Sequence, residues 1–264
     1  MKKKKGGDSQ KKKEVKVKSW QSKQKQKFAL ISILVISSII ASLYFDSTLI
    51  RYVALLKDNV LDTFFLWVTF ISSEIIIFLI LTSLFVWEAH KRKWILPLWI
   101  TFGISTIISF TLKITIQRLR PFQLGLISLL PQLQEASHLV WNFSFPSSHA
   151  MLAFCAIPIL SEKYPKLKKI WIAIAVIIAL SRVYFGLHFV SDVIAGAFMG
   201  YLIGFIIVKL EKEHKFGKKI YERIFETFKK TKLLPFFGGN ENSQENNRQV
   251  NHDLPNFDSS EVLP

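Results

Sequence analysis

The chain has 264 residues, half of them hydrophobic, and its mean hydropathy is +0.29. Several apolar runs approach the ~20 residues that cross a bilayer core, which excludes a soluble globular domain. The single cysteine, Cys155, excludes an intramolecular disulfide and a cysteine-based zinc site. A formal charge of +16 would suggest nucleic acid for a soluble protein. Here the placement of the basic residues indicates a membrane instead, and no nucleic-acid partner is expected.

Residues 1–27 form a leader that carries 12 lysines and two acidic residues. Such a charged, apolar-poor block is typical of a disordered, solvated segment, so we expect a disordered cytoplasmic leader. No small-residue cleavage pattern follows the first apolar run, which argues against a signal peptide.

Residues 28–210 contain six apolar segments, which predict an all-α integral membrane domain built as a six-transmembrane-helix bundle. The second segment is interrupted by Glu74. The fourth is short and contains Pro158, so a buried or re-entrant helix is an equally good interpretation from length alone. The segments are 28–45, 61–87, 94–112, 148–160, 170–187 and 190–210.

The distribution of lysine and arginine predicts the topology. With six spans, 29 of the 35 basic residues fall on one side: the leader, the links 88–93 and 161–169, and the chain from Lys209 onward. The other six fall on the opposite side. The positive-inside rule then places both termini in the cytoplasm of a multi-pass cell-membrane protein. A model with five spans would split the basic regions, so we expect the fourth segment to cross.

Residues 211–264 are predicted to form a basic cytoplasmic segment followed by a disordered tail. Apolar residues recur at helical spacing in 211–235 between many lysines. This pattern fits an amphipathic helix on the anionic inner leaflet, and a solvated basic tail fits equally well. The sequence from residue 238 is rich in Asn, Gln and Ser, which is typical of disorder.

The few basic residues on the outer side are clustered. Lys113, Arg118 and Arg120 follow the third segment, and Arg182 lies at the outer end of the fifth. Cations gathered away from the cytoplasm run against the topological trend, so they predict a bound anion. Snorkelling toward lipid headgroups is the alternative, and it is the better interpretation for Arg118 taken alone.

The fourth segment begins with a second anion-binding feature. Ser147 or Ser148 is placed to cap the helix, and the first N–H groups of a helix attract anions. His149 is the next residue. In isolation this is also an ordinary Pro-Ser helix start.

His188 and Asp192 are four residues apart at the start of the sixth segment, so they share a helix face if the helix begins near them. A carboxylate on one imidazole nitrogen fixes the tautomer and leaves the other nitrogen as a base or nucleophile. The alternative is a His–Asp pair that caps a helix.

These residues resemble the signature of the type 2 phosphatidic acid phosphatases, the integral-membrane lipid phosphate phosphatases. That signature has three parts, namely Lys, six residues, Arg-Pro; Pro-Ser-Gly-His; and Ser-Arg, five residues, His, three residues, Asp. The matching segments are 113–121, 146–149 and 181–192, within a resemblance covering about 61–210. Ser148 stands where the family usually has glycine, and we expect this small residue to be tolerated.

The resemblance implies a role for each matched residue. His188 would be the nucleophile, Asp192 would orient it, and His149 would be the general acid. Five residues would hold the phosphate oxygens: Lys113, Arg120, Ser147, Ser148 and Arg182. Three cations and a helix N-terminus supply the charge that phosphoryl transfer needs, so neither a metal ion nor another cofactor is expected.

The sequence therefore predicts a metal-independent membrane phosphatase that removes the terminal phosphate of a lipid through a phosphohistidine. The candidate substrates are undecaprenyl or other polyprenyl diphosphates, phosphatidic acid and phosphatidylglycerol phosphate. A lipid phosphotransferase that uses the same phosphohistidine, or a non-catalytic lipid-phosphate binder or transporter, is the alternative. Glu74 lies inside a span, and it is either functional or hydrogen-bonded between helices. The sequence leaves the oligomeric state open.

Overall fold

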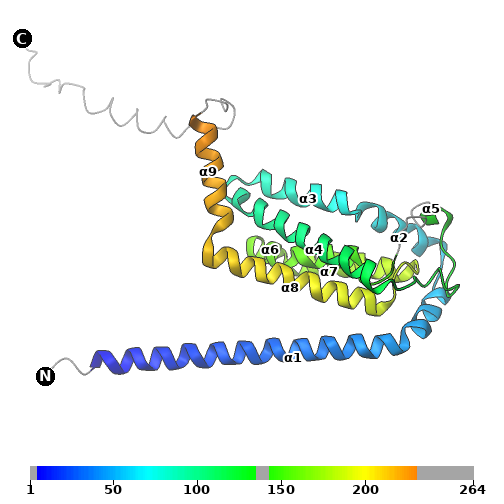
Figure 1. Ribbon diagram of the computed structural model, residues 1–264, viewed down its shortest axis with the longest axis horizontal. Coiled ribbons are helices and arrows are strands. Elements are labelled where there is room, and N and C mark those ends of the chain that lie inside the picture. Colours follow the sequence, from blue (N-terminus) through cyan, green and yellow to red (C-terminus); the bar gives the residue numbers. More distant parts are fainter. Residues whose placement is uncertain (1–4, 135–142, 231–264) are drawn as a thin grey trace, which may run out of the picture. The chain divides into compact units, whose positions relative to one another are not determined.

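The computed structural model describes residues 5–134 and 143–230, which form helices joined by irregular segments, with no strand among them (Figure 1). Two compact units are distinguished, Met1–Lys218 and Lys219–Pro264. The first unit contains the helices up to α8. The main helices are α1 (Lys5–Leu55), α2 (Asn59–Ile71), α3 (Glu74–Trp87), α4 (Ile95–Ile116), α6 (Ser148–Lys163), α7 (Lys168–Tyr184), α8 (Val190–His214) and α9 (Phe216–Lys230). Shorter helices are η1 (Ala89–Trp94), α5 (Pro131–Gln134) and η3 (Pro165–Leu167).

Each of the six predicted apolar segments is helical, and three stretches are long and apolar enough to cross a membrane. They are Ala29–Leu55, Ala89–Ile116 and Val190–His214. The α2–α3 pair adds a fourth candidate, bent by 62°. Helices α6 and α7 have 16 and 17 residues, which is short of the ~20 that span a bilayer core. The all-helical membrane fold is thus confirmed, whereas the crossing of six segments stays a prediction.

Helix α1 differs from the expectation at both ends. It begins at Lys5, so most of the leader that we expected to be disordered is helical. Lysine, glutamine and glutamate have good helix propensity, and the leader here continues an apolar helix already formed. At its other end α1 runs to Leu55 instead of stopping at Phe45, and it therefore includes Asp46.

The second predicted segment is divided at Ser72 and Ser73. The hydroxyl of Ser73 accepts a hydrogen bond from the Ile76 N–H at 3.4 Å and caps α3. Serine competes for main-chain groups in this way and favours helix starts, which explains the break. Glu74 is consequently the first residue of α3, beside the bend.

Helices α6 and α8 form the close contact at the centre of the bundle. Three glycines of α8, each four residues from the next, face main-chain oxygens of α6. A Cβ atom on Gly196 would lie 2.6 Å from the Ser147 carbonyl oxygen, and one on Gly200 or Gly204 would collide with Met151 or Cys155. Small residues at this spacing let membrane helices approach closely. The contact sets the start of α6 against the start of α8.

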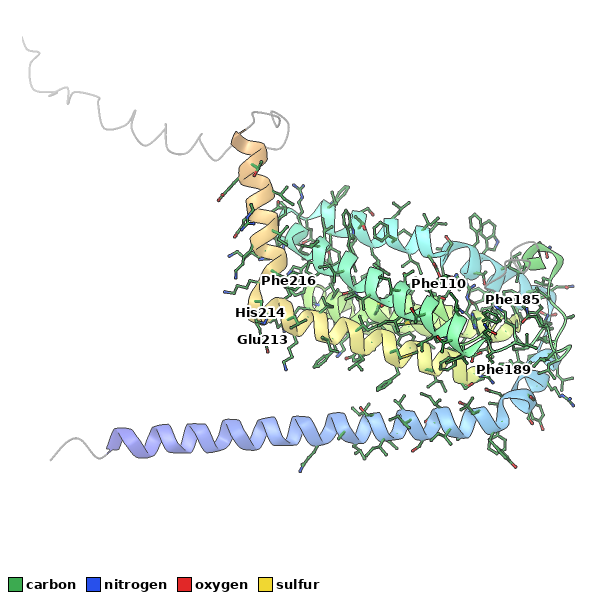
Figure 2. All side chains as sticks on the ribbon, in the orientation of Figure 1. Phe110, Phe185, Phe189, Glu213, His214 and Phe216 are labelled. Carbon is green, nitrogen blue, oxygen red and sulfur yellow. The ribbon has the colours of Figure 1, made fainter. Side chains whose placement is uncertain are left out.

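The two ends of the bundle carry different groups. Phe185 and Phe189 lie at one end of the bundle, and Glu213 and His214 at the other (Figure 2). Helices α4 and α7 finish, and α6 and α8 begin, at the end marked by Phe189. The residues singled out from the sequence come from these four helix ends.

Helix α9 begins where an amphipathic helix was expected. The carboxylate of Glu211 accepts hydrogen bonds from the N–H groups of Gly217 at 2.7 Å and Lys218 at 3.2 Å. A carboxylate is favourable at a helix N-terminus, so Glu211 fixes where α9 starts. Contact of α9 with the inner leaflet stays a prediction, and the tail from residue 238 lies outside the described residues.

Candidate active site

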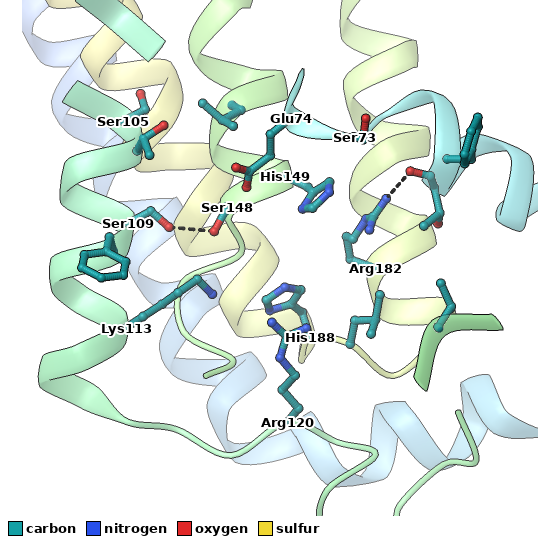
Figure 3. A pocket seen from close by; sticks show the side chains of 17 residues that line it. Ser73, Glu74, Ser105, Ser109, Lys113, Arg120, Ser148, His149, Arg182 and His188 are labelled. Atoms are coloured by element: carbon teal, nitrogen blue, oxygen red, sulfur yellow. Dashed lines mark hydrogen bonds between the residues drawn. The ribbon is translucent and has the colours of Figure 1, made fainter. Parts of the chain in front are cut away.

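A cavity of about 600 Å³ opens between the ends of α4, α6 and α7 and the turn before α8 (Figure 3). Its lining joins cations, histidines and hydroxyl groups to apolar side chains. Six of the eight predicted site residues line it, namely Lys113, Arg120, Ser148, His149, Arg182 and His188. The structure thus gathers in one cavity residues that lie up to 75 positions apart.

His188 lies in the turn between α7 and α8 and is only 3% exposed. Its Nδ1 is 2.6 Å from the carbonyl oxygen of Ser144. A carbonyl only accepts, so Nδ1 carries the proton and Nε2 keeps its lone pair. Burial lowers the pKa of His188 well below its usual range, and the charges of Arg120 and Lys113 lower it further. The imidazole is therefore neutral near pH 7.

We expected the Asp192 carboxylate to bind the His188 imidazole, but it binds other groups. Its Oδ2 accepts the Ser144 hydroxyl at 2.5 Å and the Phe189 N–H at 2.9 Å. The predicted His–Asp bond is replaced because Ser144 is inserted between the two side chains. Asp192 is connected to His188 by hydrogen bonds through Ser144, and it also caps the first turn of α8.

Lys113, Arg120 and Arg182 surround the histidines from three different segments. The Lys113 ammonium donates to the Phe143 carbonyl at 2.8 Å, and ammonium carries further N–H donors. Arg182 is 3% exposed and donates to the Ser72 hydroxyl at 2.8 Å. Its Nε has no hydrogen-bond partner within the described part of the chain. Burial lowers the pKa of Arg120 to about 10, so Arg120 stays charged at pH 7.

The two predicted serines have different positions. Ser148 lines the cavity, and its hydroxyl is 2.9 Å from that of Ser109 on α4. The described non-glycine residues with positive φ are Gln117 and Lys215, so Ser148 needs no glycine-like conformation. Ser147 is fully buried behind the cavity, with its N–H on the Asp192 carbonyl at 3.1 Å. The structure thus places Ser148, but not Ser147, among the lining residues.

Sequence reasoning missed two residues of this region and misjudged a third. Ser144 was not singled out, because nothing in its local pattern marks it. Asp46 marked the end of the predicted first apolar segment, whereas it lies within α1. An acidic residue next to a long apolar run was the signal that could have identified it. Arg118, for which lipid contact was the better interpretation, binds both Asp46 and Asp192.

Glu74 also lines the cavity, close to His149 (Figure 3). It reaches the site because α3 starts at the bend beside α7. A carboxylate near Lys113 and Arg182 balances part of their charge. In the described residues no group of three or more His, Cys, Asp and Glu side chains is arranged to hold a metal ion.

The cavity joins two histidines and three cationic side chains at one end of an all-helical membrane bundle, an arrangement that can bind an anion. Residues 94–216 match the sequence model of the PAP2 superfamily. The resemblance stated from the three motifs is confirmed over this part of the chain.

Two curated relatives are similar to about half of the chain. Phosphatidylglycerophosphatase B of Bacillus subtilis is 33% identical over 138 residues, or 48% of this chain and 63% of the relative. An undecaprenyl-diphosphatase of Sulfolobus acidocaldarius is 31% identical over 135 residues, or 49% of this chain and 61% of the relative. The chain therefore spans less than two thirds of the length of these relatives.

Two solved structures share the fold. One is a transmembrane PAP2-type phosphatidylglycerolphosphate phosphatase from Bacillus subtilis, with 26% identity and a TM-score of 0.55. The match covers 71% of this chain and 95% of that one. The other is LpxE of Aquifex aeolicus, with 28% identity, a TM-score of 0.52, and coverage of 62% and 95% respectively.

Proposed function

We propose that the chain is a lipid phosphatase that hydrolyses the terminal phosphate of a lipid phosphate or diphosphate. The observation that carries this proposal is the cavity, in which a neutral, tautomer-fixed His188 is surrounded by three cations and a second histidine. Phosphoryl transfer needs positioning and dispersed positive charge more than covalent assistance. This cavity supplies both from the protein alone.

In the first step, Nε2 of His188 attacks phosphorus while the bond to the lipid oxygen breaks. Lys113, Arg120 and Arg182 bind the non-bridging oxygens and stabilise the charge that they carry in the transition state. His149 gives its proton to the departing bridging oxygen, so the lipid alcohol, or the lipid monophosphate when the substrate is a diphosphate, leaves with a proton on that oxygen. The product of this step is a phosphohistidine at position 188.

In the second step, a water molecule attacks the phosphohistidine and gives a proton to His149. The P–N bond breaks, its electron pair returns to Nε2, and inorganic phosphate leaves. His149 is then protonated for another cycle, as microscopic reversibility requires of a residue that acts first as acid and then as base. Both histidines therefore end the cycle in their starting state.

The cavity also has a side suited to a lipid. Phe70, Phe110, Leu133 and Leu152 line it together with the cations. Phe110 belongs to a stretch long and apolar enough to cross a membrane, so this side of the cavity is suited to the acyl chain of a membrane lipid. A lipid phosphate has an apolar tail that matches the apolar side chains and a phosphate that matches the cations. Lipids with one phosphate and those with a diphosphate both meet this requirement.

The proposed membrane orientation follows from charge. With both termini in the cytoplasm and six crossings, the ends of α4 and α7 and the starts of α6 and α8 face outward. The site would then act on the outer surface of the cell membrane. Because the site residues line one cavity, a single face of the membrane would carry the reaction.

Phosphate release from a panel of purified lipid phosphates, with and without EDTA, tests the proposal. We expect release from at least one of a polyprenyl diphosphate, phosphatidic acid and phosphatidylglycerol phosphate, and we expect it to survive EDTA. Vanadate, which mimics a trigonal-bipyramidal phosphoryl group, should inhibit. Loss of activity in EDTA with recovery on adding magnesium would contradict the metal-free mechanism. Transfer of phosphate to an added lipid or sugar alcohol in place of water would favour a phosphotransferase.

A further inference from the structure

Arg118 joins two buried carboxylates behind the cavity. Its Nη2 donates to Oδ2 of Asp46 at 2.7 Å, and its Nη1 donates to Oδ1 of Asp192 at 2.6 Å. Asp46 is 2% exposed and Asp192 is fully buried. Removing one of these three charged side chains would leave a buried charge without its counter-ion. The position of each side chain therefore depends on the other two. Asp46 belongs to α1, outside the region 94–216 that matches the PAP2 superfamily.

Asp46 also holds the first turn of α8. Its Oδ1 accepts the Ser191 N–H at 3.1 Å, and its Oδ2 accepts the Ser191 hydroxyl. Arg118 donates to the same hydroxyl at 2.7 Å. Because Ser191 precedes Asp192, the Asp46 carboxylate fixes the main chain next to the second carboxylate. A negative group is favourable at this helix N-terminus.

Ser144 links Asp192 to the His188 imidazole by hydrogen bonds. Its hydroxyl donates to Asp192, its carbonyl accepts from His188, and its N–H donates to the Arg118 carbonyl at 2.7 Å. All the polar groups of this fully buried residue are therefore used within one connected set. A shift of Asp192 would move the carbonyl that fixes the tautomer and direction of His188.

We propose that Asp46 is a positioning residue for the reaction at His188. It holds Arg118 and the start of α8, which fix Asp192, which through Ser144 orients the imidazole. The inference rests on the proposed phosphatase function and extends it to α1. Asp46 does not line the cavity, so it acts on the rate of the chemical step and not on phosphate binding.

Asp46→Asn in the full chain, purified in detergent, tests this inference. We expect kcat to fall about 10- to 100-fold, the cost of a small displacement of a reacting group, while KM changes by less than about twofold. Inhibition by inorganic phosphate, a ground-state ligand, should keep its wild-type concentration dependence. The matched control is Asp62→Asn at the same end of the bundle. Asp62 accepts the Tyr184 hydroxyl at 2.7 Å and, in the described residues, makes no contact with Asp46 or Arg118. The Asp62→Asn variant should therefore keep the wild-type kcat.

Arg118→Lys provides a second variant that keeps the charge between the carboxylates. A single ammonium cannot reproduce the planar fork that binds both acids, so kcat should fall to a similar extent. Because the two residues act in one set, the double variant should be little slower than either single one. Full kcat in Asp46→Asn, or parallel losses of kcat, inorganic phosphate affinity and thermal stability, would overturn the inference. A wild-type protein that releases no phosphate from any lipid would instead overturn the proposed function with it.

Discussion

The imidazole of His188 is held by a main-chain carbonyl and surrounded by positive charge, and both features control its protonation. A nucleophilic histidine works in its neutral form. Since its pKa is lowered well below the usual range, the neutral form persists at acidic pH values where an ordinary histidine is already protonated. We therefore expect the acid limb of kcat/KM, which reports groups of the free enzyme, to lie well below the pH at which an ordinary histidine titrates. Half-maximal activity near pH 6.5 on the acid side, traced to His188, would contradict the burial argument.

Glu74 places a carboxyl group in the cavity that Lys113, Arg120 and Arg182 line. Its carboxylate lies near Lys113 and Arg182, so it weakens their attraction for phosphate. Glu74→Gln should lower the inhibition constant of inorganic phosphate by about tenfold, equivalent to about 1.4 kcal/mol. Glu88→Gln is the matched control, because Glu88 follows the opposite end of α3 and binds Lys91 at 2.7 Å. Equal phosphate affinities in wild type and Glu74→Gln would show that the carboxylate does not act on the anion.

At the scale of single elements, the contact of α6 with α8 determines whether His149 and His188 share a cavity. Gly200→Ala should lower the thermal unfolding temperature, because its Cβ meets the Met151 main chain. Overpacking of this kind typically costs about 1–3 kcal/mol. Gly103→Ala is the control: it lies in α4 with nothing within 4 Å of the added Cβ, so stability should hold or rise slightly. Identical melting of the two variants would argue against a close α6–α8 contact.

Helix positions were predictable from apolar runs, since burying them in lipid requires helices. The break at Ser72–Ser73 was not, because serine within an apolar run is compatible with a continuous helix. The extent of α1 was also misjudged, because Asp46 looked like a boundary when its carboxylate is satisfied by Arg118 inside the bundle.

Some residues of the site were predictable from the spacing of the sequence motifs, and others were not. Lys113, Arg120, His149, Arg182 and His188 were identified by motif spacing, and all of them line the cavity. Ser144 could not be identified, since its role depends on a carbonyl and a hydroxyl that only the folded chain brings to His188 and Asp192. Motif spacing therefore predicts the residues that line the cavity. The residues that hold His188 and Asp192 in place are recognised only from contacts between segments far apart in the sequence.

At the scale of the whole molecule, the orientation in the membrane decides which leaflet supplies the substrate. A cysteine replacing Leu124, which is 51% exposed between α4 and α5, should react with a membrane-impermeant thiol reagent in intact cells. A cysteine replacing Lys166, in η3 between α6 and α7, should react only after the cells are opened. The native Cys155 is fully buried, so the unaltered chain serves as the background control. The reverse labelling pattern would move the reaction to the cytoplasmic leaflet.

The central claim is that His188 carries phosphate during the reaction, and rapid quenching with a substrate labelled on its terminal phosphate tests it most directly. We predict an acid-labile label on His188 in the wild type and none in His188→Ala. In His149→Ala we predict that the label still forms from p-nitrophenyl phosphate, whose leaving group needs little protonation, but forms slowly from an alkyl phosphate. A label on His149, or a labelled intermediate that survives in His188→Ala, would contradict the account.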